Sequence, residues 1–234
     1  MKRVFVPSGS GSDWQRLLGK PDLHWKKGYS AMSAASSWEE ASDKLPQEIL
    51  DLFKTANDPA LADLELLAAV PEWEVPLPGG VRPSQTDVLA LARNSTGLVV
   101  IGVEAKVDEP FGPLLGKERA TASPGKLERI RYLEAQLERE QPFADSVHYQ
   151  LLHRTVSALL TARAFHAQTA VMLVQSFSPT SKWRENFDAF CTEMNALPVA
   201  NGLLEANLSK SPRLLLGWCT GDPRHRETEL PSAL

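Results

Sequence analysis

The alternation of apolar and polar residues in the middle of the chain predicts a β-hairpin. Two apolar runs, over 88–92 and 98–103, flank the polar turn sequence NSTG. Short apolar runs separated by such a cluster are typical of paired strands. Counting outward from the centre of this turn makes Asp87 and Glu104 cross-strand neighbours, with Cβ atoms about 5 Å apart.

Apolar spacing also predicts the elements on either side of the hairpin. Before it, leucines at helical spacing favour a helix over 60–69, and alternation favours a short strand over 73–77. After it, we expect a loop over 107–122, helices near 123–141 and 145–165, buried strands at 170–175 and 214–219, and a helix after Ser181 that separates these two strands.

Both ends of the chain are expected to add to this central part. Apolar patterns favour a short strand over 3–7 and helices over 12–18 and 45–54. Residues 24–38, rich in small and aromatic side chains, are expected to pack as an irregular arm. Residues 222–234 are polar and are expected to form a loose tail.

The predicted hairpin brings chemically active side chains together. Lys106 lies two residues beyond Glu104 and therefore on the same face of its strand. Two carboxylates about 5 Å apart repel by about 3 kcal/mol at an effective dielectric near 20. A hard divalent cation relieves that repulsion, because carboxylate oxygens are its preferred ligands. The alternative is that Lys106 simply forms a structural ion pair with Glu104.

Composition narrows the class of protein. The chain has 234 residues, 43% of them hydrophobic, which suits one globular α/β domain with elaborations. A net charge of -4 argues against a broadly basic nucleic-acid coat but allows a local basic patch. Two cysteines without ligand spacing make zinc unexpected. No segment has the apolar length of a signal peptide or membrane span, so we expect a cytoplasmic protein with no membrane partner.

Asp87, the hairpin and the sequence Glu104-Ala105-Lys106 at the end of an apolar strand resemble the PD-(D/E)XK nuclease superfamily, which has the restriction-endonuclease-like fold. The predicted order of elements over 58–178 resembles the αβββαβ core of that superfamily. The resemblance implies an α/β fold with a mixed central sheet flanked by helices. Residues 1–57 would be an arm and helices packed on the core, 107–141 a basic loop-helix insertion, and 179–234 a C-terminal helix, strand and tail of the same single domain. These additions resemble those of a bacterial family with this core.

The resemblance also implies roles for individual residues. Asp87, Glu104 and the Ala105 carbonyl would bind Mg²⁺ (or Mn²⁺), and Lys106 would position the attacking water. An acid on the first core helix often completes the site, and Glu65 is the best match, although it is equally typical of an interfacial helix residue. The residues that match phosphate-contacting positions on the helix after the motif are Gln150, His153 and Arg154.

A basic neighbourhood follows the motif. Residues 117–131 hold five basic side chains, including Lys126 and Arg129, which are candidates for substrate binding. A solvated helix face explains the same pattern equally well.

The leading hypothesis is therefore a metal-dependent nuclease that acts on DNA or RNA, with a homodimer as one option. A second hypothesis is a nucleic-acid-binding or assembly protein that keeps the fold without cutting. A third is a structural ion-pair cluster in an unrelated α/β enzyme.

Overall fold

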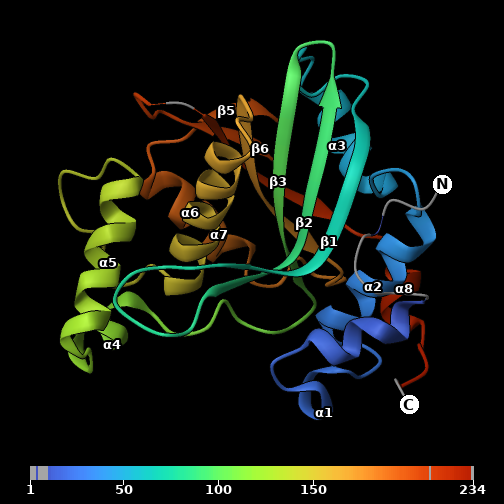
Figure 1. Ribbon diagram of the computed structural model, residues 1–234, viewed down its shortest axis with the longest axis horizontal. Coiled ribbons are helices and arrows are strands. Elements are labelled where there is room, and N and C mark those ends of the chain that lie inside the picture. The colour runs from blue at the N-terminus through green and yellow to red at the C-terminus, as the bar shows by residue number, and fades with distance from the viewer. Residues whose placement is uncertain (1–3, 5–9, 211, 233–234) are drawn as a thin grey trace.

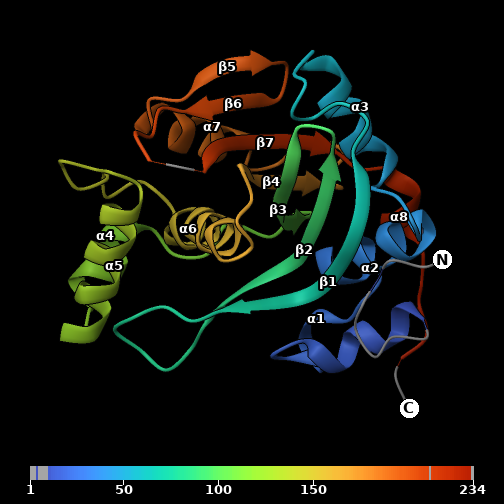
Figure 2. The same ribbon diagram turned by 45° about the horizontal axis from the view of Figure 1, so that its top comes forward.

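A seven-stranded mixed sheet forms the centre of the computed structural model, which describes residues 4, 10–210 and 212–232. The strand order is β1-β2-β3-β4-β7-β6-β5, and Figure 2 shows this order across the molecule. The strands are β1 (Glu65–Val75), β2 (Ser84–Asn94), β3 (Gly97–Lys106), β4 (Thr169–Ser176), β5 (Leu197–Ala200), β6 (Leu203–Ala206) and β7 (Arg213–Thr220). The expected α/β class with a mixed sheet flanked by helices is confirmed.

Helices cover both faces of this sheet, with α5, α6 and α7 on one side and α2, α3 and α8 on the other (Figure 1). The helical elements are the 3₁₀ helix η1 (Gly11–Leu17), α1 (Pro21–His24), α2 (Ser30–Ala41), α3 (Gln47–Thr55), α4 (Leu115–Ala120), α5 (Pro124–Gln136), α6 (Tyr149–Ala164), α7 (Arg184–Glu193) and α8 (Pro223–Glu227). In the described part of the chain, no helix has the length and apolar character needed to cross a membrane.

The hairpin of β2 and β3 has the predicted register. The antiparallel pairs run from Asn94 with Gly97 to Val88 with Val103. One further step places Asp87 opposite Glu104. β3 then pairs in parallel with β4, and α6 is the crossover helix between them. Neighbouring residues of β3 alternate between the two hydrophobic clusters, so Val100 faces α6 and Ile101 faces α2.

A glycine sets the distance between α6 and β3. A Cβ added at Gly102 would lie only 3.2 Å from the Cβ of Ala158 on α6. The next residue on the same face of β3 is Glu104, about 6.6 Å further along the strand. Arg154 lies one helical turn, about 6 Å, before Ala158. This close approach therefore brings Arg154 over Glu104.

Four sequence-based predictions are wrong. The loop expected over 107–122 contains the helix α4. Residues 60–69 do not form a helix; β1 begins at Glu65 and contains most of the predicted short strand. Residues 30–41 form the regular helix α2 instead of part of an irregular arm. The segment after Gly221 is not wholly a loose tail, because it includes α8, whose His225 is 4% exposed. The strand predicted over 3–7 lies outside the described residues except for Val4, which forms a bridge with Ala69.

Candidate functional site

A cavity of about 840 Å³ lies where β1 and β3 end and β2 begins. Residues from the N-terminal segment 18–31, the loop 109–113 and the first turns of α6 line its walls. Its floor includes Asp87, Glu104 and Lys106. The cavity therefore collects the three residues that the hairpin pattern predicted.

Three carboxylates lie in one row across neighbouring strands. Asp87 on β2 is opposite Glu104 on β3, and its Oδ2 accepts a hydrogen bond of 2.8 Å from the backbone N–H of Ala105. On the other side of Asp87 is Glu72 on β1, because the neighbouring residues pair Pro71 with Val88 and Trp73 with Thr86. Glu72 also lines the cavity and has a positive φ of 52°.

Sequence reasoning missed Glu72, although a signal for it was present. Asp87 and Glu104 were paired by counting outward from the centre of the second turn. The same count from the centre of the preceding turn, between Gly79 and Gly80, pairs Asp87 with Glu72. The predicted helix over 60–69 directed attention to Glu65 instead.

Glu104 is surrounded by hydrogen-bond donors. Its Oε1 accepts from Lys106 Nζ at 2.6 Å and from Gln150 Nε2 at 2.7 Å. Its Oε2 accepts from Nε of Arg154. Gln150 and Arg154 are four residues apart on α6 and therefore share a face. Glu104 is 2% exposed and Lys106 5%, so water screens this cluster little.

Burial and mutual repulsion change how the carboxylates titrate. Burial and the neighbouring charge of Glu104 raise the pKa of Asp87 to about 7. Burial and Asp87 likewise raise the pKa of Glu72 well above its ordinary value. Burial alone would raise the pKa of Glu104, but Arg154 and Lys106 outweigh it and lower that pKa. Glu104 is thus the carboxylate that stays charged, while Asp87 and Glu72 hold protons to higher pH.

His153 belongs to the same network through Ser84. The Ser84 hydroxyl accepts from Nη1 of Arg154 at 3.2 Å and lies 2.8 Å from Nδ1 of His153. The hydroxyl also donates to the backbone carbonyl of His153 at 3.4 Å, so these contacts fit either tautomer of the neutral ring. Burial and the positive charge of Arg154 lower the pKa of His153 well below its ordinary value.

The remaining predicted residues lie away from the carboxylate row. Glu65 is at the opposite end of β1, exposed and 3.1 Å from Nε of Arg93. Lys126 pairs with Glu118 at 2.6 Å and its Nζ lies 3.6 Å from the ring centroid of Tyr149.

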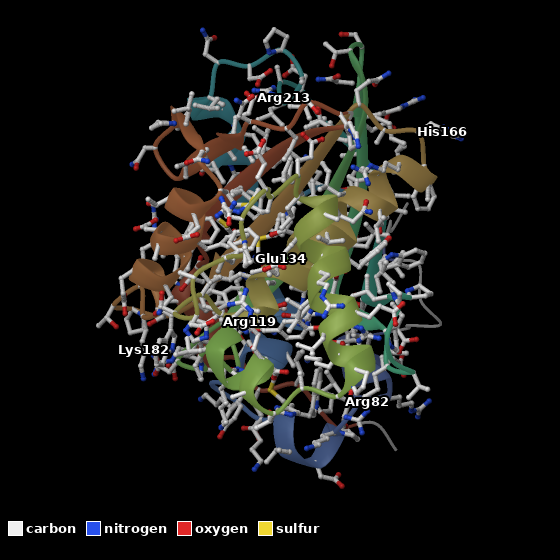
Figure 3. All side chains as sticks on the ribbon, turned by 90° about the vertical axis from the view of Figure 1, so that its left-hand side faces the viewer. Arg82, Arg119, Glu134, His166, Lys182 and Arg213 are labelled. Atoms are coloured by element: carbon white, nitrogen blue, oxygen red, sulfur yellow. The ribbon has the colours of Figure 1, made fainter. Side chains whose placement is uncertain are left out.

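Arg129, a predicted substrate-binding residue, binds the backbone of the turn between β1 and β2. Its guanidinium donates to the carbonyls of Leu77, Pro78, Gly80 and Arg82, and so holds the turn between β1 and β2. It is 9% exposed and is absent from the residues that line the cavity. Figure 3 labels Arg82, from that same turn, near the end of the molecule where the N-terminal helices lie.

The donor set suits a cation that needs few protein ligands. Within the described ranges, no group of three or more His, Cys, Asp or Glu residues is arranged to hold a metal ion. Magnesium, however, is usually bound by one or two carboxylates plus water and substrate phosphate. Asp87 and Glu104 supply such a pair. Beside them, Oε1 of Gln150 is a buried acceptor with no partner among the described residues.

Comparison with known proteins identifies a family. A family model described as "Domain of unknown function (DUF6946)" matches residues 7–223. No curated protein matches. No solved structure matches. Because the matched range spans most of the 234 residues, the chain belongs to the DUF6946 family.

Proposed function

We propose that this protein is a divalent-metal-dependent nuclease with a restriction-endonuclease-like core. The observation that carries the proposal is the pair Asp87 and Glu104 on the cavity floor, with Lys106 Nζ 2.6 Å from Glu104. The raised pKa of Asp87 supports it, because a fold selected only for stability would not place the half-buried Asp87 beside the buried Glu104. The strand pattern, three antiparallel strands followed by a crossover helix and a parallel strand, agrees with the proposed core.

Each residue has a role in this proposal. Asp87 and Glu104 hold the ion, whose chemistry is to stabilise charge on the phosphate and to activate water. Lys106 orients the attacking water. Gln150 donates to Glu104 through its Nε2 and so helps to hold that carboxylate. Arg154 keeps Glu104 ionised and fixed in orientation. His153 lines the cavity and contacts the substrate as a neutral ring.

The proposal predicts a specific pattern of cleavage. Labelled single- and double-stranded DNA and RNA would be incubated with the protein in Mg²⁺, Mn²⁺ or EDTA. We expect cleavage with either ion, none in EDTA, and a loss of roughly 100- to 1,000-fold in Asp87→Asn and Lys106→Met. Glu65→Gln is the matched control, since it neutralises a carboxylate of the same sheet that lies outside the cavity. This variant should cleave like the wild type.

A second candidate function is binding of nucleic acid without cleavage. The observation that favours it is that both oxygens of Glu104 already accept hydrogen bonds from Lys106, Gln150 and Arg154, which closes the ion-pair cluster. This candidate predicts that Mn²⁺ neither binds in calorimetry nor raises the melting temperature, and that Asp87→Asn leaves nucleic-acid affinity unchanged. Divalent-dependent cleavage that disappears in Asp87→Asn would eliminate it.

A further inference from the structure

We infer that the cavity admits the free end of a single nucleic-acid strand, a few nucleotides long, and excludes the interior of a duplex or of a closed circular strand. This inference rests on the proposed function, because it specifies the substrate of the same site. Three features of the cavity carry it: its joined walls, its depth and its charge.

The walls of the cavity are tied together. The N-terminal segment 18–31 and the loop 109–113 both line the cavity. Glu109 connects them, because its Oε1 accepts a hydrogen bond of 2.8 Å from the backbone N–H of Ser30 at the start of α2. Its Oε2 accepts at 2.8 Å from the backbone N–H of Val107, which fixes the carboxylate to the end of β3. A polymer that ran through the site would have to pass this connection.

A further hydrogen bond ties the N-terminal segment to the sheet. Nε2 of Gln85 on β2 donates to the carbonyl of Leu17 at 3.1 Å. Gln85 and Glu109 both line the cavity, so both connections border the space that a substrate would occupy. A strand that enters by its end does not need to separate either of them.

The reacting groups lie deep. Glu104 and Lys106 are 2% and 5% exposed, so a phosphate must enter the cavity to reach them. In a duplex, each phosphate lies on the outside of a wide, stiff double helix that does not enter a narrow recess. The cavity volume of about 840 Å³ is within the range of about 300–1,000 Å³ typical of sites that enclose small ligands, which suits a few nucleotides.

The number of exposed positive charges in the cavity lining favours a short substrate. Five carboxylates line the cavity: Glu72, Glu74, Asp87, Glu104 and Glu109. Four basic side chains line it: Lys20, Arg82, Lys106 and Arg154. Lys106 and Arg154 are already paired with Glu104. The exposed cations are Lys20 and Arg82, enough for about two phosphates, whereas proteins that grip duplex DNA neutralise about six to ten.

The test compares substrates of one sequence that differ only in their ends. The wild-type protein would be given a linear single strand, the same strand as a covalently closed circle, and the blunt duplex, each as DNA and as RNA, in Mg²⁺ and in Mn²⁺. We expect the linear strand to be shortened progressively from an end, and the circle and the duplex interior to be cut roughly 100-fold more slowly or not at all. The Asp87→Asn protein, purified in parallel, measures any contaminating nuclease.

Each result decides a different question. A circle opened about as fast as the linear strand is cut, with the activity lost in EDTA and in Asp87→Asn, would overturn the inference and leave the proposed nuclease intact. Absence of cleavage on every substrate, with both ions, would overturn the proposed function and the inference with it. Shortening from one end only would support the inference and give the polarity of entry.

Discussion

At the scale of single residues, the carboxyl of Asp87 makes the stability of the protein depend on pH. Its pKa is raised from 3.8 to about 7, so the folded protein holds a proton at pH values where the unfolded chain has lost it. Stability therefore falls as the pH rises from about 4 to about 7, and the loss is complete above that window. Asp87→Asn, in EDTA, removes this unfavourable charge and should stabilise the protein at pH 8 by about 1–2 kcal/mol, a few degrees in melting temperature. The expected gain is modest because Asp87 is only half-buried and water screens part of the repulsion.

The comparison of two pH values makes this prediction specific. At pH 4 the wild-type carboxyl is protonated when folded, so most of the difference between Asp87→Asn and wild type should disappear. Thermal unfolding followed by circular dichroism measures both. Asp43→Asn, at an exposed position, should shift neither melting temperature by more than about one degree. A destabilised Asp87→Asn at pH 8 would mean that the attraction of Arg154 and Lys106 outweighs burial and the repulsion by Glu104.

At the scale of elements, the short helix α8 is held in place by the contacts of one buried side chain. Helix α8 has only five residues, yet it carries the buried His225. Nδ1 of His225 lies 2.9 Å from the Ser36 hydroxyl, and its ring meets the ring of Phe177 at a centroid distance of 6.2 Å. His225→Ala removes both contacts and leaves a cavity, so it should destabilise the protein by about 2–3 kcal/mol in urea unfolding.

The same helix offers a matched control. Glu227 is exposed, and its carboxylate lies 3.8 Å from Nζ of Lys27. Exposed ion pairs contribute little, so Glu227→Ala should change the free energy of unfolding by less than about 0.5 kcal/mol. Equal effects of the two substitutions would contradict the structural role of His225 and would support the loose tail expected from the polar sequence.

The hairpin could be predicted at the level of elements because its signals are local. The register of β2 and β3 follows from the two apolar runs and the NSTG turn between them. Because side chains alternate along a strand, this register also gives the positions of Asp87, Glu104 and Lys106. Residues 66–70 of β1 carried no such signal. A register shift between Leu66 and Ala68 breaks the alternation, and the resulting leucine spacing resembles that of a helix. Pro71 is tolerated because β1 is an edge strand of the sheet.

Helix α2 was missed for the opposite reason. Residues 32–38 are all buried, so the helix has no polar stripe to produce a period of 3.6. The ties that close the cavity could not be predicted either, because Glu109 meets Ser30 across 79 residues. Contacts of that range depend on how the layers stack, and the local pattern of residues does not encode them.

At the scale of the whole molecule, the N-terminal helices are part of the core. Trp38, Ile49 and Phe53 are at most 2% exposed and belong to the hydrophobic cluster on one face of the sheet. Nε1 of Trp38 donates to Oε1 of the buried Gln175 on β4 at 3.0 Å. Each large apolar side chain that is fully buried contributes about 1.5–3 kcal/mol. Three of them therefore approach the entire stability of a typical domain, about 5–15 kcal/mol.

Deletion of residues 1–57 tests this role. The remaining chain, 58–234, keeps every strand but exposes one apolar face of the sheet. We expect it to lose its cooperative thermal transition and near-ultraviolet circular dichroism and to bind a hydrophobic dye, as collapsed states without fixed packing do. The full chain should instead unfold in one transition. A truncated chain that melts cooperatively within a few degrees of the full protein would show that the sheet and α5–α7 fold without the N-terminal layer. The N-terminal segment would then serve only as a wall of the cavity, and its removal should open the site to circular strands.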